Sequence, residues 1–140
     1  MIPAAVASGH LATTAAAVEV LAVGGNAIDA CVAAGFAAAV AEPTLTSLAG
    51  GGFLLARTAE GEEVVFDFFV DTPGLGLAAD SATPLDFAEV VVRFSAADQG
   101  FHVGLGSVAV PGCLAGWLHA HRRLGRVALD VVTGPARRLA

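Results

Sequence analysis

Two adjoining stretches near the start of the chain carry the apolar spacing of helices. Residues 8–23 are rich in alanine, and their larger apolar side chains share one face. Ser8 is a suitable N-cap for this helix. Gly24-Gly25 predicts its end, because glycine readily adopts the left-handed conformation found at helix C-termini.

A second helix is predicted to start at Asn26 and to run to about residue 41. Asn26 can cap it, with Asp29 in the first turn, and Pro43 prevents the helix from continuing. Because this stretch is apolar nearly all round, we expect it to be buried. Its many alanines and one glycine would let another element approach closely.

The middle of the chain changes to the pattern of strands. Residues 53–57 and 63–70 are rich in branched and aromatic side chains, and the polar stretch 58–62 between them predicts a hairpin. Further strands are predicted at residues 90–94 and 104–110.

The last part of the chain returns to helical spacing. We expect one helix over residues 113–124, ended by Gly125, and another from residue 129 onward with Pro135 in its first turn. Helices and strands together predict the α/β (α+β) class.

Composition narrows the classes of protein further. The chain has 140 residues, which suits one domain or part of one, with 56% hydrophobic and 14% charged residues. Soluble domains average about 25% charged residues, so this chain has an unusually apolar surface. Such a surface usually meets another chain or the rest of its own chain. A disordered tail and a disulfide scaffold are both excluded.

Charge and the length of the apolar runs exclude nucleic acid and the membrane as partners. The net charge is −6 and basic residues are sparse, so we expect no nucleic acid. Five of the seven arginines lie in residues 122–140, which predicts a basic helix end on an acidic body. The longest apolar run, residues 30–41, is shorter than the roughly 20 residues that a spanning helix needs, so we expect no membrane partner. Residues 1–9 contain no basic side chain, and we therefore expect a cytoplasmic protein.

Three glycine motifs are candidates for phosphate or nucleotide binding. Gly50-Gly51-Gly52 could cradle an anion, but the chain has no lysine, so a tight loop before a strand is the better interpretation. Residues 74–79 and 104–109 match G-x-G-x-x-A, yet neither opens a helix after a strand.

Histidines and cysteines indicate no metal site. The histidines are His10, His102, His119 and His121; the last two do not share a helix face, and neither of these has an acid or cysteine at ligand spacing. We interpret Cys31 and Cys113 as core thiols rather than nucleophiles. The pattern of residues alone therefore does not define a reaction.

Several blocks in order along nearly the whole chain resemble the amino-terminal part of the γ-glutamyltransferase (γ-glutamyltranspeptidase) family. They are Val6–His10, Val20–Ala30 with its GGNA-D-A sequence, Ala41–Pro43, Gly50–Leu55, Gly106–Gly112 and Pro135–Ala140. The GGNA-D-A block, the glycine loop and the valine-proline-glycine block are specific in combination.

The resemblance implies an Ntn-hydrolase fold, a four-layer αββα sandwich, of which this chain would be an incomplete part. It implies a precursor that cuts itself before a threonine, which becomes the nucleophile with its own amine as base. The substrate would be the γ-glutamyl group of glutathione or a similar amide, and the partner would be the remainder of the same precursor, the small subunit. No metal or organic cofactor is implied.

The family's processing threonine would lie beyond residue 140, so the resemblance names no catalytic residue in this chain. We expect residues 1–140 to be the N-terminal part of a single, truncated domain that is inactive alone.

One stretch departs from the family. The family's Asp-x-Arg-Glu-x-Ala-Pro, whose arginine binds the α-carboxylate of the donor, corresponds here to residues 67–73, with Phe69 at the arginine and Val70 at the glutamate. Phe69, Val70 and Asp71 are the candidate substrate-binding residues. Either the donor lacks the α-carboxylate, an arginine from elsewhere (Arg57 or Arg93 included) replaces the missing one, or the site has decayed.

Three functions therefore stand open. The first is a fragment of a γ-glutamyltransferase-like enzyme. The second is a fragment of a glutaryl or cephalosporin acylase-like amidase that lacks the arginine. The third is a non-catalytic truncated product.

Overall fold

The computed structural model describes residues 4–74 and 86–140, and these form two compact units. The first unit combines Met1–Phe69 with Pro111–Ala140, and the second is Val70–Val110. The G-x-G-x-x-A motif at residues 74–79 lies, beyond Gly74, outside the described residues.

Helix α1 (Leu11–Ala22) is capped by His10, whose Nδ1 accepts the Ala12 N–H at 3.1 Å. The prediction of Ser8 as the N-cap is wrong, because the Ser8 hydroxyl donates to the His10 carbonyl and the chain turns helical only at Leu11. The predicted stop is confirmed, since Gly24 has a φ of +96°.

Helix α2 (Ala27–Ala41) begins with the capping box expected from its sequence. The Asn26 side chain accepts the Ile28 and Asp29 N–H groups, and the Asp29 carboxylate accepts the Asn26 N–H at 2.8 Å. The prediction that this helix is buried on all sides is wrong, because Cys31 is exposed while its neighbours Ala30 and Val32 are buried. The expected close approach is confirmed at Gly35, where a Cβ would stand 3.0 Å from the Trp117 ring.

Strands β1 (Phe53–Arg57) and β2 (Glu63–Asp67) pair antiparallel, which confirms the predicted hairpin, although β2 ends before residue 70. The Gly50-Gly51-Gly52 loop before β1 has a structural role, as expected for a tight loop before a strand. The Gly50 carbonyl accepts the N–H groups of Gly112 and Cys113, and thereby satisfies donors at the start of the following helix.

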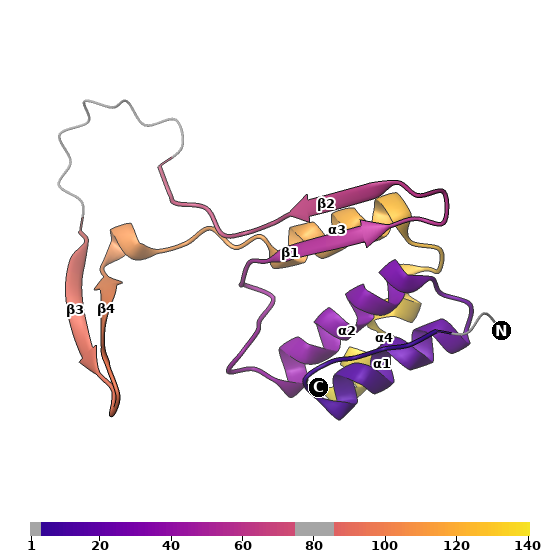
Figure 1. Cartoon of the computed structure of the whole chain (residues 1–140), viewed down its shortest axis with the longest axis horizontal. Helices are drawn as coiled ribbons and strands as arrows, with labels where there is room; N and C mark the ends of the chain where they lie inside the picture. The colour runs from indigo at the N-terminus through magenta and orange to yellow at the C-terminus, as the bar shows by residue number, and fades with distance from the viewer. Residues whose placement is uncertain (1–3, 75–85) are drawn as a thin grey trace. The chain divides into compact units, whose positions relative to one another are not determined.

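That helix, α3 (Cys113–Leu124), lies along the hairpin, and α4 (Leu129–Leu139) packs against α2 (Figure 1). Both helices were predicted, but the prediction that Pro135 lies in the first turn of the last helix is wrong. Because α4 begins at Leu129, Pro135 lies inside the helix, where it has no N–H to offer the Val131 carbonyl. The buried Pro135 ring packs in the interior instead.

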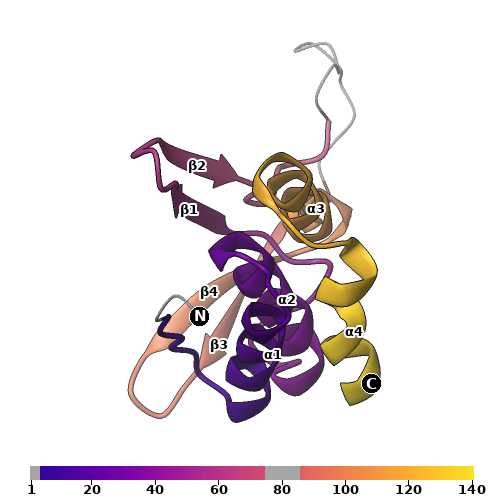
Figure 2. The ribbon, with the colours of Figure 1, turned by 90° about the vertical axis from the view of Figure 1, so that its right-hand side faces the viewer.

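The core of the first unit lies where α1, α2, α3 and α4 meet (Figure 2). Its buried residues are Val20, Val32, Ala33, Cys113, Trp117 and Val132. A second cluster joins the hairpin to α3 through Ala56, Phe66 and Ala120. The hairpin therefore has one face on a helical layer.

A carboxylate is fully buried beside this core. Both oxygens of Asp29 accept the Arg126 N–H at 3.0 Å, and His121 Nε2 lies 3.4 Å from Oδ1. The Asn26 side chain also donates to the Leu124 carbonyl at 2.6 Å. The capping box of α2 thus fastens the turn between α3 and α4.

The basic carboxyl-terminal part meets acidic side chains of the first unit. Arg123 lies 3.0 Å from Glu62, and Arg138 donates to Glu19 at 2.6 Å. These ion pairs agree with the expected basic helix end on an acidic body.

The second unit is built on the hairpin of β3 (Ala88–Arg93) and β4 (Asp98–Val103). The strand predicted at residues 90–94 is confirmed, although β3 begins two residues earlier and ends one residue earlier, whereas the strand predicted at 104–110 is wrong. Gly104, at a φ of +112°, turns the chain into a short 3₁₀ helix, η1 (Leu105–Ser107), and only Val110 forms a bridge, with Asp71. Every residue of the two strands is exposed.

None of the helices in the described ranges is long and apolar enough to cross a membrane.

Candidate functional site

Phe69, which we predict at the position of the family's arginine, lies two residues beyond the end of β2 in the first unit. Its N–H donates to Asp67 Oδ1 at 3.0 Å. Its ring stacks on that of Phe53, with centroids 5.6 Å apart and planes inclined by 9°. Both rings remain largely in solvent, at 63% exposure for Phe53 and 59% for Phe69.

Strand alternation explains why these two rings meet. Phe53 is opposite Asp67 in the register, and successive side chains point to opposite faces of the hairpin. Leu54, Phe66 and Phe68 consequently pack toward α3. Phe53, Asp67 and Phe69 are left on the outward face, where Phe69 reaches Phe53 diagonally.

The other two predicted residues belong to the second unit. The Asp71 backbone forms a bridge with Val110, with N···O distances of 3.2 and 2.7 Å, and Asp71 Oδ1 accepts the Thr72 N–H. Val70 is the first residue of that unit. Of the three candidates, only Phe69 thus shares a unit with Phe53 and Asp67.

Arg57 is poorly placed to replace the missing arginine. It occupies the opposite end of β1 from Phe53, about 13 Å away at the usual rise of an extended strand. There its Nε lies 3.9 Å from Glu63. Arg93, the other arginine considered, belongs to the second unit and lies 3.9 Å from Asp98.

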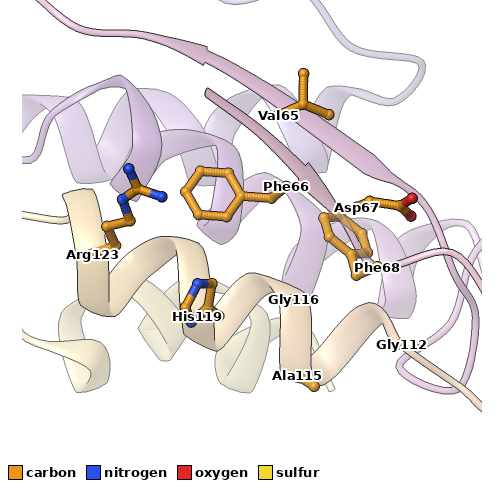
Figure 3. Close-up of a pocket in the computed structure, with 9 residues that line it drawn as sticks. All are labelled: Val65, Phe66, Asp67, Phe68, Gly112, Ala115, Gly116, His119 and Arg123. Carbon is orange, nitrogen blue, oxygen red and sulfur yellow. The ribbon is translucent and has the colours of Figure 1, made fainter. Parts of the chain in front are cut away.

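A groove of about 440 Å³ runs between β2 and α3 in the first unit (Figure 3). The Arg123 guanidinium lies 5.8 Å from the centroid of the Phe66 ring, and His119 meets the same ring edge-on at 5.7 Å. Small residues of α3 form the other side of the groove. At Gly116 a Cβ would stand 2.2 Å from the Phe68 ring, so only glycine allows this approach.

Among the residues that the structure describes, none pairs with the backbone groups on the edge of β2 along this groove. Phe68 exchanges both backbone hydrogen bonds with Gly52, and the antiparallel alternation then turns the N–H and C=O of Val65 and Asp67 away from β1. Within the described part of the chain, β1 is the only strand that pairs with β2. Sequence analysis did not single out this groove, although Gly112, Ala115 and Gly116 at helical spacing are a sign of close packing.

Neither cysteine has the features of a nucleophile. Cys113 is buried, as predicted, and desolvation raises the pKa of its thiol, which disfavours the reactive thiolate. For Cys31 the core prediction is wrong, because the residue is exposed. Among residues 4–74 and 86–140, no three metal-ligating side chains converge on one point.

These features define a mixed α/β unit in which an antiparallel hairpin covers a helical layer, with an unpaired strand edge and an exposed apolar face. The Gamma-glutamyltranspeptidase family model matches residues 13–140, and the chain belongs to this family.

Solved and curated relatives agree with this assignment. The crystal structure of Helicobacter pylori gamma-glutamyltranspeptidase superposes with a TM-score of 0.74 at 35% identity, covering 96% of this chain and 36% of that one. The predicted mixed α/β fold of the Ntn-hydrolase type is thereby confirmed.

Two curated relatives are proenzymes. The acylase ACY 1 proenzyme of Pseudomonas sp. (strain SE83) is 40% identical over 96% of this chain and 24% of its own length. The glutathione hydrolase proenzyme of Pseudomonas sp. (strain A14) is 36% identical over 96% of this chain and 22% of its own length. The chain therefore spans about a quarter of the length of these relatives.

Proposed function

We propose that this chain is the amino-terminal region of an N-terminal-nucleophile enzyme that transfers or hydrolyses the γ-glutamyl group of glutathione or a related amide. The family match over residues 13–140 is the observation that carries this proposal. The proenzyme relatives support it, because a precursor of their length has room for a nucleophile beyond residue 140.

The reaction consists of two acyl transfers. The threonine hydroxyl attacks the amide carbonyl and gives its proton, through the threonine's own α-amine, to the departing nitrogen. The C–N bond breaks and an ester to the enzyme forms. Water or an amine then attacks the ester, releases the acid or a new amide, and returns the proton to the threonine oxygen. The chain's own residues would shape the donor pocket, and no cofactor takes part in this scheme.

The partner in this proposal is the remainder of the same precursor. The free N–H and C=O groups of Val65 and Asp67 are suited to an added strand, since an unpaired edge is a ready template for pairing. Such a strand would also cover the groove beside Ala115 and His119. The apolar composition of the chain fits burial of this kind.

A second candidate is an acylase-like amidase, and Phe69 is the observation that favours it. A phenyl ring forms no ion pair with a carboxylate, and the charged group that contacts Phe69 is the anionic Asp67. A donor that carries an α-carboxylate would therefore meet an aromatic ring and a negative charge. An acylase and a glutathione hydrolase both align with nearly the whole chain.

Four p-nitroanilide donors separate these candidates when tested on the processed product of the complete reading frame. The γ-glutamyl donor has an amine and a carboxylate, glutaryl only the carboxylate, 4-aminobutyryl only the amine, and butyryl neither. Highest kcat/KM for γ-glutamyl supports the first candidate, and highest kcat/KM for 4-aminobutyryl or butyryl supports the second. Highest kcat/KM for glutaryl supports an acylase-like amidase but contradicts the role given to Phe69. Turnover of none of them, or a reading frame without a downstream threonine motif, leaves the non-catalytic product and refutes both.

The variant Phe69→Arg sharpens this test. If position 69 faces the donor, a guanidinium there raises kcat/KM for γ-glutamyl and glutaryl by about tenfold or more, because it supplies a charge-assisted pair. Butyryl serves as the matched control, since it offers no carboxylate. Equal effects on all four donors would show that position 69 does not contact the donor.

A further inference from the structure

We propose that Phe53 and Phe69 together form an aromatic wall of the acyl-donor pocket, and that the enzyme takes donors with an uncharged, preferably aromatic, acyl group. The inference rests on the second candidate function, the acylase-like amidase, for the position of Phe69 in the donor pocket. It adds Phe53, a second specificity-determining residue, and a chemical class of substrate.

The geometry of the two rings supports a binding surface. Nearly parallel planes at a centroid separation of 5.6 Å make one continuous apolar surface from two elements of the hairpin. Each ring leaves about three fifths of its residue exposed, at 63% and 59%. Aromatic side chains prefer such offset-stacked or edge-to-face neighbours, so a further ring is the partner that this surface suits best.

The charges around the pair select against an anion. The Asp67 carboxylate lies on the same face, opposite Phe53 in the register, and accepts the Phe69 N–H. The one arginine on this face of the hairpin, Arg57, lies at its other end beside Glu63. A negatively charged acyl group would be desolvated here without a cation to pair with, whereas an uncharged group would not.

The backbone leaves this end of the hairpin open. Phe53 follows the loop Gly50-Gly51-Gly52 directly, and these three residues add no side chain beside the rings. Gly52 is held by its paired backbone bonds to Phe68, and this pairing places Phe53 and Phe69 diagonally across from each other, on either side of the Gly52–Phe68 pair. The rings are thus positioned by the fold rather than by contact with each other alone.

The test compares 4-phenylbutyryl and butyryl p-nitroanilides on the processed full-length enzyme. The phenyl group of the first donor occupies the place that the carboxylate of a γ-glutamyl donor would take. We expect wild-type kcat/KM to be about tenfold higher for 4-phenylbutyryl than for butyryl. In Phe53→Ala and Phe69→Ala this preference should disappear, chiefly through KM.

Two further variants keep the result interpretable. Leu55→Ala is the matched control, because Leu55 is exposed on the same face but opposite Val65, and it should retain the preference. Phe53→Leu retains apolar volume without a ring, so it should process normally and still lose the preference. Loss of the preference in Leu55→Ala, or its survival in both alanine variants, overturns the proposal.

Binding measured without turnover separates this inference from the proposed function. Isothermal titration calorimetry with 4-phenylbutyrate should give a Kd that rises about tenfold in Phe53→Ala. If no anilide is cleaved but this difference is found, the reaction is wrong and the aromatic wall stands. If anilides are cleaved and Phe53→Ala binds 4-phenylbutyrate as tightly as the wild type does, the proposed aromatic wall is refuted and the proposed reaction is retained.

Discussion

The two units of the chain bury their residues very differently. In the first, Val20, Val32 and Val132 are completely inaccessible, and Asp29 is buried with all its partners in place. In the second, both strands of the hairpin expose every residue, Val90, Val91 and Val92 included.

The difference shows how local pairing and a core contribute separately to stability. The β3–β4 hairpin has complete strand pairing and stacked rings such as Phe87 on His102, 4.3 Å apart. An isolated two-stranded hairpin is nonetheless marginal in water, because it buries too little apolar area. The β1–β2 hairpin has the same architecture, yet one of its faces rests on α3. We therefore expect mutations to be costly in the first unit and nearly neutral in the second.

The largest effect is expected at Asp29. Asp29→Ala leaves the N–H groups of Asn26 and Arg126 without their acceptor, which should cost about 3 kcal/mol or more. Amide exchange measured by mass spectrometry should then accelerate about 100-fold in the first turn of α2 and around Arg126. Asp98→Ala, at an exposed acid of the second unit, is the matched control and should stay within about 0.5 kcal/mol. Similar effects at both positions would remove the distinction between the units.

A pair of valine truncations tests the comparison directly. Val32→Ala deletes two methyl groups from a fully buried side chain and should cost about 2 kcal/mol. Val91→Ala removes the same atoms from an exposed strand position and should cost less than about 0.5 kcal/mol. Urea unfolding followed by circular dichroism gives both values. A cost at Val91 as large as at Val32 would mean that the second unit is buried in the intact protein.

Glycine-to-alanine changes in two helices should have opposite signs. Gly116→Ala places a Cβ against the Phe68 ring and should destabilise by about 1 to 3 kcal/mol through overpacking. Gly134→Ala meets only the flexible end of Arg138 and should stabilise by about 0.5 kcal/mol through helix propensity. Thermal unfolding of the two variants side by side measures the difference. A neutral Gly116→Ala would indicate that the hairpin moves freely on α3.

The smallest effect is expected at the surface ion pair of Arg138 with Glu19. Both side chains are more than half exposed, so Arg138→Ala should cost less than about 1 kcal/mol. A double-mutant cycle with Glu19→Ala, repeated in 1 M salt, should show the coupling shrink with screening. A coupling that salt leaves unchanged would place this pair among the buried interactions of the first unit.

Local sequence signals predicted most elements of the first unit correctly. Asn26 and Asp29 specify the capping box from neighbouring residues, and the polar stretch at 58–62 specifies the first hairpin. One error arose where a distant contact prevailed over local preference, and another where the backbone angle of a single residue decided the outcome. Pro135 is tolerated inside α4 because its ring is buried, and Gly104 ends β4 with a φ that no residue pattern reveals. Strand β4 itself was missed, because Gly100 in its middle reads as a break.

The candidate site divides in the same way. The exchange of the family's arginine for Phe69 is a prediction from the sequence, since it depends only on alignment with a motif. Its stacking on Phe53 depends on the register of β1 and β2, which tertiary pairing sets.

Residues close together along the chain encode the family, the order of the four helices and the first hairpin, and the predicted exchange of the family's arginine for Phe69. Three contacts became evident from the folded chain alone: Asp29 holds the α3–α4 turn, Gly116 brings α3 against Phe68, and Phe53 stacks on Phe69. These contacts join residues that are far apart in sequence, and their geometry follows from packing and strand register, which no local pattern specifies.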